Sequence, residues 1–208
     1  MSTSFLKTRC SSTVGVRIGV LALQGNISEH IEAFERALRH RGQDSFSVFP
    51  VKRPKELDNC TALAIPGGES TTISRLIEKN GLHEPIRTFK GGIFATCAGM
   101  VLVADRVDDR RIRTLGLIDM VVDRNAFGRQ KESFEAQLAI KGLNGGTFHA
   151  FFIRAPVATG TGPGVHVLAS IPRGIVAVEQ GRHMALSFHP ELGSDTRLHE
   201  RFLKNLGI

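Results

Sequence analysis

The sequence predicts an α/β fold: a three-layer sandwich in which helices cover both faces of a mostly parallel sheet with added antiparallel strands. Short apolar runs, typical of strands buried on both faces, recur through the first half of the chain. Segments with apolar residues at helical spacing follow several of these runs, which is the alternation of βα units. Beyond Leu117, closely spaced strand-like runs predominate and indicate hairpins or antiparallel strands that extend the sheet.

The first βα unit begins with the apolar run Val16 to Leu23, which predicts a buried strand. A turn of Gln-Gly-Asn follows it. Apolar residues at positions 27, 31, 34 and 38 then recur at helical spacing, and Gly42 provides a C-terminal stop. We expect this segment to be an amphipathic helix.

Three more strands are predicted before residue 100, at about Phe46 to Val51, at Ala62 to Ile65 and, as a buried strand, at Gly92 to Thr96. After the second of these, a Pro-Gly-Gly turn leads into a helix that Ser70 or Thr71 is predicted to cap and that ends at Gly81. After the third, Ala98 to Ala104 is predicted to be the start of a helix. Strand, turn and helix therefore alternate.

The second half of the chain is predicted to be richer in strands. Six strand-like runs occur, at Leu117 to Val122, Phe134 to Ile140, Ala150 to Ile153, Val165 to Ala169, Ile175 to Glu179 and Met184 to Phe188. Apolar residues at 198, 202, 203 and 206 predict a terminal helix within 194 to 206. In a fold of this class, ligands bind at the carboxyl ends of the parallel strands.

The composition fits one domain. The 208 residues, 41% of them hydrophobic, suffice for a complete core, and we expect residues 1 to 208 to form it. Residues 1 to 15 lack the apolar centre of a secretory signal and are expected to be a flexible lead, with a transit peptide as the alternative. Three cysteines without a CxxC pair argue against disulfides and a zinc site, and fit a reducing cytoplasm.

Composition also disfavours membrane and nucleic-acid partners. No run approaches the roughly 18 to 20 apolar residues of a membrane helix. The net charge of +7 is diffuse, apart from the dense stretch Asp108 to Arg113, which includes acids and is predicted to be a solvated loop. Because Trp and Tyr are absent, little could stack on bases. We expect no membrane or nucleic-acid partner, no metal and no cofactor.

Cys97 is the first candidate for chemistry. It follows a predicted buried strand and precedes Ala98, Gly99 and a predicted helix. A nucleophile elbow has this layout, because the sharp turn between strand and helix needs small neighbours. The start of the helix favours the thiolate, the reactive form. A buried structural cysteine would fit the same residues equally well.

His189 and Glu191 lie two residues apart at the end of another predicted strand, in the sequence SFHPE. A relay of cysteine, histidine and carboxylate needs an imidazole to accept the thiol proton and an acid to fix its tautomer. By itself the H-x-E pattern is common and would fit a surface feature. Together with an elbow on the same sheet, it becomes specific for nucleophilic catalysis.

The segment PGGES at 66 to 70 is a third candidate, since it combines a strand end, two glycines and a helix start with free backbone N–H groups. Acyl transfer needs fixed donors for an oxyanion beside the nucleophile. An ordinary βα turn with a helix cap is the alternative. The segment lacks the lysine of a nucleotide P-loop, so phosphate transfer is disfavoured.

These three segments and several others resemble those of class I (triad) glutamine amidotransferases, and more narrowly the glutaminase subunits of pyridoxal 5′-phosphate synthase. The matching segments are LQG at 23–25, KRP at 52–54, PGGESTT at 66–72, TCAG at 96–99, RNAFGRQ at 124–130, SFE at 133–135, FIRAP at 152–156 and SFHPE at 187–191. RNAFGRQ and FIRAP distinguish this family from other amidotransferases. The resemblance spans roughly residues 16 to 206 and implies the flavodoxin-like fold of that class.

The resemblance also implies the roles of individual residues. Cys97, His189 and Glu191 would form the catalytic triad, and the backbone N–H groups of Gly68 and Ala98 would form the oxyanion hole. The residues implied to bind glutamine are Gly68, Glu69, Ser70, Arg124, Ile153 and Arg154. This set suits a zwitterion, which needs a cation for its carboxylate and acceptors for its ammonium. Without the resemblance, the two arginines would be ordinary surface residues.

Three departures from the family pattern occur: the long lead before Val16, Ala95 where the elbow often has glycine, and the short link between Phe89 and Ile93. Ala95 adds a methyl group at a crowded turn and could distort the elbow. The other seven histidines have no partner at catalytic spacing and are predicted to be solvated or structural: His30, His40, His83, His149, His166, His183 and His199.

By this resemblance the chain would hydrolyse L-glutamine to L-glutamate and ammonia through a cysteine thioester. The ammonia would pass through a channel to a (β/α)8 synthase subunit that makes pyridoxal 5′-phosphate. An amidotransferase subunit of another pathway, such as histidine synthesis, is a first alternative, which RNAFGRQ disfavours. A catalytically inactive regulatory or binding protein is another, which the intact set of cysteine, histidine and glutamate disfavours. A cysteine peptidase or stress-response hydrolase on a related fold is the last, and it does not require PGGES or the two arginines.

Overall fold

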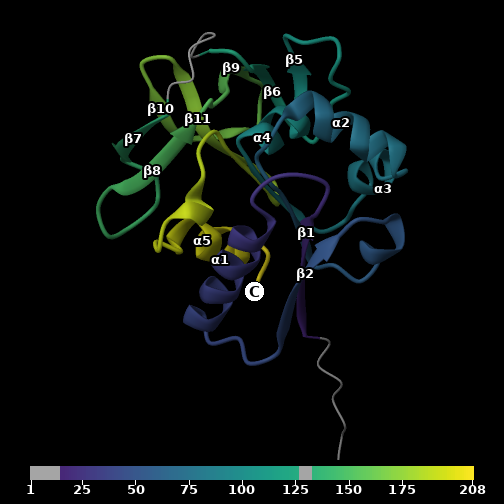
Figure 1. The fold of residues 1–208 in the computed structure, drawn as a ribbon. Helices are drawn as coiled ribbons and strands as arrows, with labels where there is room; N and C mark the ends of the chain where they lie inside the picture. The colour runs from purple at the N-terminus through teal and green to yellow at the C-terminus, as the bar shows by residue number, and fades with distance from the viewer. Residues whose placement is uncertain (1–14, 127–132) are drawn as a thin grey trace, which may run out of the picture.

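A computed structural model describes residues 15–126 and 133–208 of the chain, and Figure 1 shows its ribbon. Within these residues, five α-helices accompany two sheets. The helices are α1 (Ile27–His40), α2 (Ser70–Lys79), α3 (His83–Arg87), α4 (Ala98–Val103) and α5 (Arg197–Asn205). Short 3-10 turns occur at Pro54–Glu56 and Pro190–Leu192.

The larger sheet has ten strands in the order β2-β1-β3-β4-β12-β11-β9-β6-β5, with β10 paired to β11. Its members are β1 (Val16–Leu21), β2 (Phe46–Val51), β3 (Ala62–Ile65), β4 (Gly92–Thr96), β5 (Ala104–Val107), β6 (Ile118–Asp123), β9 (Val157–Thr161), β10 (His166–Ile171), β11 (Gly174–Gln180) and β12 (His183–Leu186). The strands β2, β1, β3, β4 and β12, which are neighbours in this order, run parallel to one another. Strands β11 and β9 pair with antiparallel neighbours. The predicted fold class is confirmed.

Helices cover both faces of this sheet (Figure 1). On one face, Phe34 of α1 and Phe202 of α5 pack against Phe94 of β4 in one apolar cluster. On the other, residues of α2, α3 and α4 form a second cluster with Ile65 and Ile93 of the sheet. Each strand between them is apolar on both sides, which is why β3 and β4 are continuous apolar runs.

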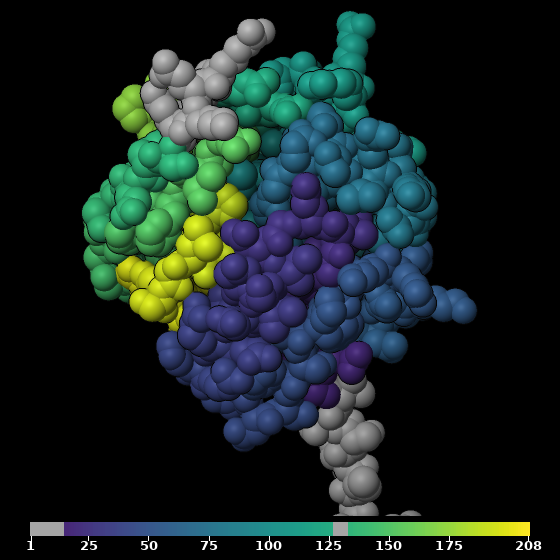
Figure 2. Space-filling view, in the orientation of Figure 1, coloured from purple at the N-terminus to yellow at the C-terminus, as the bar shows by residue number. Residues whose placement is uncertain are grey.

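A separate antiparallel hairpin, β7 (Ser133–Leu138) and β8 (Phe148–Ile153), covers part of the first face. Phe148 and Phe152 of β8 pack against Phe188, which follows β12. Figure 2 shows the C-terminal segment between α1 and this hairpin, so three segments that are distant in the sequence lie side by side. This packing fixes the end of β8 beside the end of β12.

The buried strands match their prediction closely, and β2, β3 and β4 have the predicted bounds. The helix predicted to start within Ala98 to Ala104 begins at Ala98 but already ends at Val103, because the chain enters β5 there. Three further elements were not predicted, namely α3, β5 and β9. Strand β5 (ADRV) has two exposed charged residues in four, and α3 has only five residues, so neither shows a clear apolar period.

Candidate active site

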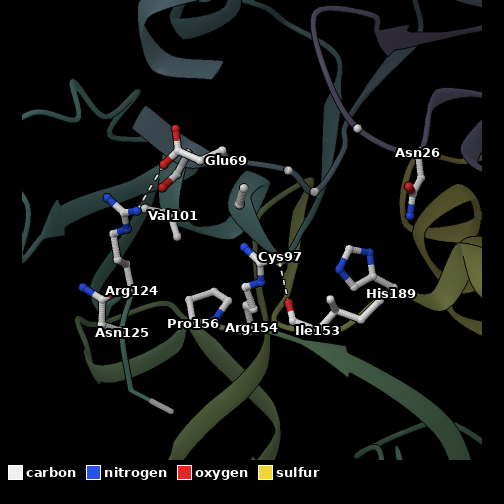
Figure 3. A pocket seen from close by; sticks show the side chains of 15 residues that line it. Asn26, Glu69, Cys97, Val101, Arg124, Asn125, Ile153, Arg154, Pro156 and His189 are labelled. Carbon is white, nitrogen blue, oxygen red and sulfur yellow. Dashed lines mark hydrogen bonds and ion pairs between the residues drawn. The ribbon is translucent and has the colours of Figure 1, made fainter. Parts of the chain in front are cut away.

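The predicted site residues meet at the carboxyl ends of the parallel strands, around a cavity of about 360 Å³. Every one of them lines the cavity except Glu191, which lies behind His189. Figure 3 shows Cys97 in the middle, with His189 on one side and the pair Glu69 and Arg124 on the other. The cavity therefore has a catalytic end and a charged end.

Cys97 occupies the turn between β4 and α4. Its φ of 49° and ψ of −109° lie where non-glycine residues are rarely found, which is the strained backbone of a nucleophile elbow. The turn is held by the backbone N–H of Cys97, which donates to the carbonyl of Leu186 at 2.8 Å. Gly99 allows α4 to approach β3, since a Cβ at Gly99 would lie 2.2 Å from the carbonyl oxygen of Ile65.

Ala95 does not disturb this elbow. It is fully buried, and it pairs in regular register with Ile65 of β3 and Ala185 of β12. Its methyl group lies next to Gly99, at 3.3 Å from where a Cβ on that glycine would be. The expected distortion by Ala95 is therefore not observed, because Gly99 leaves room for it.

His189 follows β12 and faces the cysteine. Its Nδ1 lies 2.7 Å from Oε1 of Glu191, and both side chains are buried. Its backbone N–H donates to the carbonyl of Phe151 in β8 at 2.9 Å, which ties the ring to the hairpin. A Cβ at Gly67 would lie 2.5 Å from Cε1 of His189 and 3.1 Å from Cβ of Cys97, so this glycine leaves space between imidazole and thiol.

The pKa values of His189 and Glu191 are both strongly shifted. Burial would lower the pKa of His189, but hydrogen bonds to Cys97 and Glu191 and their negative charges outweigh burial and raise the pKa to about 10. Burial opposes ionisation of Glu191, yet His30 and His189 lower its pKa to about 2. At neutral pH the imidazole is therefore protonated beside a carboxylate, which is the state that pairs with a cysteine thiolate.

At the charged end, Glu69 caps α2. Its carboxylate accepts hydrogen bonds from the backbone N–H groups and the hydroxyls of Thr71 and Thr72. The predicted cap, Ser70 or Thr71, is thus wrong: Ser70 is the first residue of the helix, and the longer glutamate side chain reaches all four donors. Burial opposes ionisation of Glu69, but these hydrogen bonds lower its pKa to about 2.

Arg124 follows β6 and forms ion pairs with two carboxylates. Its Nη2 lies 3.1 Å from Oε1 of Glu69, and its Nη1 lies 2.6 Å from Oδ2 of Asp109. The segment around Asp109 was predicted to be a solvated loop, which is wrong for this residue: its side chain is only 13% exposed and is paired with Arg124. Hydrogen bonds from Arg111 and Arg124 hold the pKa of Asp109 well below its usual range.

Ile153 and Arg154 leave the end of β8 at the edge of the cavity. The carbonyl oxygen of Ile153 lies 3.6 Å from Sγ of Cys97. Arg154 has a φ of 47°, so the chain bends sharply at this point. Of the motif RNAFGRQ, residues 127 to 130 lie outside the described residues, as does Cys10.

Three further residues lie at the site that sequence reasoning did not assign to it, although Gln24 belongs to the LQG segment that resembles the family. Asn26 Nδ2 lies 3.4 Å from Oε1 of Glu191, and Nε2 of His30 lies 3.5 Å from the same oxygen. Gln24 Oε1 accepts a hydrogen bond from the backbone N–H of Glu69 at 3.0 Å. All three lie at or near the start of α1, and only the pairing of β1 with β3 brings them to the site.

Neither a metal site nor a membrane-spanning helix is found within residues 15–126 and 133–208. No three histidine, cysteine, aspartate or glutamate side chains gather in a way that could hold a metal ion. No helix in this part of the chain is long and apolar enough to cross a membrane.

Comparison with known proteins agrees with this geometry. The model of the SNO glutamine amidotransferase family matches residues 20–207. A relative from Methanoregula boonei named pyridoxal 5′-phosphate synthase subunit PdxT is 67% identical over 194 residues, which is 93% of this chain and all of the relative. A protein of the same name from Methanoculleus marisnigri is 62% identical and covers 94% of this chain and all of its own length.

Among solved structures, one described as a glutamine amidotransferase is 43% identical and superimposes with a TM-score of 0.81. The match covers 92% of this chain and 99% of that one. Sequence and fold thus agree over nearly the whole length, and the chain belongs to the SNO glutamine amidotransferase family.

Proposed function

We propose that the chain is a glutaminase that hydrolyses L-glutamine to L-glutamate and ammonia with Cys97 as nucleophile. The observation that carries this proposal is the alignment of Cys97, His189 and Glu191, in which the 2.7 Å contact to Glu191 orients an imidazole that flanks the thiol. An intact set of this kind argues against a catalytically inactive binding protein. The pocket is small and presents a carboxylate and a guanidinium, which suits a free amino acid. This argues against a peptidase, which must admit a polypeptide chain.

The reaction follows from the protonation states. The Cys97 thiolate attacks the side-chain amide carbon, and the developing oxyanion takes hydrogen bonds from the backbone N–H groups of Gly68 and Ala98. Protonated His189 gives its proton to the leaving nitrogen, and ammonia departs from the γ-glutamyl thioester. Neutral His189 then removes a proton from water, which attacks the thioester and releases glutamate.

Glutamine binding uses the charged end of the cavity. The carboxylate of Glu69 accepts the substrate ammonium, and the guanidinium of Arg124 binds the substrate carboxylate. Ser70, Ile153 and Arg154 complete the wall. The cavity of about 360 Å³ suits a ligand of this size. Since Arg124 is already paired with Glu69 and Asp109, substrate binding exchanges ion pairs.

The ammonia serves a separate synthase subunit that makes pyridoxal 5′-phosphate. The names of the relatives support this assignment, because both are described as subunits of that synthase. Hydrolysis without the partner would waste glutamine, so we expect the oxyanion hole to be completed only when the partner docks. We place the reaction in the reducing cytoplasm, where the Cys97 thiol stays reduced.

The deciding experiment measures glutaminase activity of the wild type and of Cys97→Ala, each with and without the co-purified synthase subunit. We expect turnover in the wild-type complex and a loss of at least about a thousandfold in the variant, as for removal of a nucleophile. Retained turnover in Cys97→Ala would refute the proposal. Equal activity with and without the synthase would refute completion of the oxyanion hole on docking.

A further inference from the structure

His30 is the buried ionisable group nearest to the triad that the reaction above does not use. It belongs to α1, and its ring is fully buried. Nε2 lies 3.0 Å from Oγ1 of Thr96, the residue before the nucleophile, and 3.5 Å from Oε1 of Glu191. One nitrogen thus faces the strand end that carries Cys97 and the acid that orients His189.

The surroundings of Nε2 select one tautomer. If Nε2 carried a lone pair, it would face the negative Oε1 of Glu191 and be repelled by it. If it carries the proton, the N–H donates to Oγ1 of Thr96, and its positive end faces Oε1 of Glu191 at 3.5 Å. The other oxygen of Glu191, Oε2, is buried and accepts no hydrogen bond from any residue the structure describes. Contacts at Oε1 therefore fix the carboxylate.

Burial keeps this histidine neutral. It lowers the pKa of His30, and His189 lowers it further, against the opposing effects of Glu191 and Glu29. His30 also affects the pKa of His199, which it lowers. A neutral His30 can hold Glu191 by its N–H without competing with His189 as the cation that the carboxylate stabilises.

His199 provides a contrast within the same apolar cluster. It is also fully buried, but neither of its ring nitrogens has a hydrogen-bond partner among residues 15–126 and 133–208. Its ring stacks on Phe94 with centroids 4.8 Å apart. His199 therefore packs as an aromatic side chain, whereas His30 directs a polar atom at the site.

We propose that His30 is a positioning residue: its neutral Nε2–H holds Oε1 of Glu191 toward His189 and ties the carboxylate to the strand end that precedes Cys97. This inference rests on the triad proposed above and extends it by a fourth side chain. His30 touches neither substrate nor thiol, so it acts through Glu191. This role goes beyond the solvated or structural one predicted for the histidines outside the triad.

Three variants test the inference. His30→Leu keeps much of the volume and removes the donor. His30→Gln retains an amide N–H at about the reach of Nε2. His199→Leu is the matched control, since it removes an equally buried histidine that makes no hydrogen bond. Thermal unfolding of each variant shows that it is folded before it is assayed.

The first readout is the pH dependence of Cys97 alkylation by iodoacetamide, which needs neither glutamine nor the synthase. With Glu191 less well held, the thiolate–imidazolium pair forms less readily, so the alkylation midpoint should rise by about one pH unit in His30→Leu. In the complex with the synthase, kcat of His30→Leu should fall by roughly 10- to 100-fold with little change in KM for glutamine. This is the size of effect seen when a residue that orients a functional side chain is removed. His30→Gln should recover most of both effects, and His199→Leu should match the wild type.

A second measurement needs no variant. The ¹⁵N chemical shifts of His30 in the wild type should report a neutral ring with the proton on Nε2 throughout the active pH range. A proton on Nδ1, or a charged ring, would overturn the inference, as would a wild-type alkylation profile in His30→Leu. If His30→Gln were as impaired as His30→Leu, shape and not the hydrogen bond would be responsible. An ordinary thiol profile in the wild type would instead remove the triad itself, and the inference with it.

Discussion

The two ends of the cavity are built in opposite ways. At the catalytic end, Glu191 is 3% exposed and contacts His189, whose backbone N–H bonds to Phe151 of β8. At the charged end, the side chain of Glu69 is 42% exposed, and Arg124 is shared between two carboxylates. Buried charges act at low dielectric and cannot rearrange, whereas exposed ion pairs are weak and exchange easily.

This difference separates two tasks. The catalytic end must have the same geometry in every step, because proton transfer fails when groups are misplaced by about 1 Å. The charged end must release its internal ion pairs to admit a zwitterion and form them again afterwards. Changes at the first end should therefore act on kcat, and changes at the second on KM. The predictions below test this division.

The largest effect is expected for Glu191→Gln. The amide keeps the shape of the side chain but removes the charge that stabilises the imidazolium of His189. We expect kcat in the complex to fall by about a hundredfold or more, with KM changed little. Glu78→Gln, at an exposed ion pair with Arg113, is the control and should be unaffected. A rise in KM alone would contradict the division.

The variant Glu191→Gln should also change how the Tm depends on pH. The pKa of His189 is raised to about 10, so its contribution to the free energy of unfolding is complete below its ordinary pKa of about 6.5 and is lost as the pH rises toward 10. Without the Glu191 charge, part of this contribution disappears. The Tm of Glu191→Gln should therefore fall less steeply between pH 7 and 10 than that of the wild type. Parallel curves would argue against the raised pKa.

A smaller effect is expected for Arg124→Gln, at the charged end. Loss of the guanidinium removes a charged hydrogen bond to the substrate carboxylate and should raise KM for glutamine by about tenfold while kcat changes little. Arg106→Gln provides a control, because Arg106 is 72% exposed and contacts Asp105 away from the cavity. If kcat fell and KM did not change, Arg124 would belong to the catalytic machinery instead.

The smallest effect is expected for Asp109→Asn. Asp109 is ionised at neutral pH and competes with the substrate carboxylate for Arg124. Removing its charge should lower KM by about two- to threefold, as suits a partly exposed ion pair. The exposed Asp105→Asn is the matched control. An increase in KM would show that Asp109 orients Arg124 and does not compete with the substrate.

Prediction from sequence succeeded best where local pattern and tertiary environment agree. The strands β3 and β4 were predicted with their observed bounds, because central strands are buried along their whole length. Strand β2 lies at one edge of the sheet and was also predicted with its bounds, because its Phe and Val residues favour a strand. Strand β5 was not, because an edge strand needs little apolar surface and Asp105 and Arg106 point to solvent. The cap of α2 was misassigned because Ser and Thr are the commoner caps, while Glu69 is used here.

At the site, the motifs predicted which residues meet at the cavity but not all of their partners. The small residues after Cys97 and the H-x-E pattern are local features, and their geometry follows from one strand end each. The contact of Asn26 with Glu191 joins positions 165 residues apart. No spacing rule relates such positions, so His30 and Asp109 could be assigned only from the structure.

From the amino-acid sequence we could predict the parallel strands at the centre of the sheet, the sharp turn at Cys97 and the residue types of the triad. These depend on short-range backbone preferences and on apolar runs of a few residues. The pairing of distant charges followed only from the folded chain: His30 faces Glu191, and Arg124 faces both Asp109 and Glu69. The physical reason is that strand order arises from burial summed over the whole sheet, and contacts between distant charges exist only after that order is set.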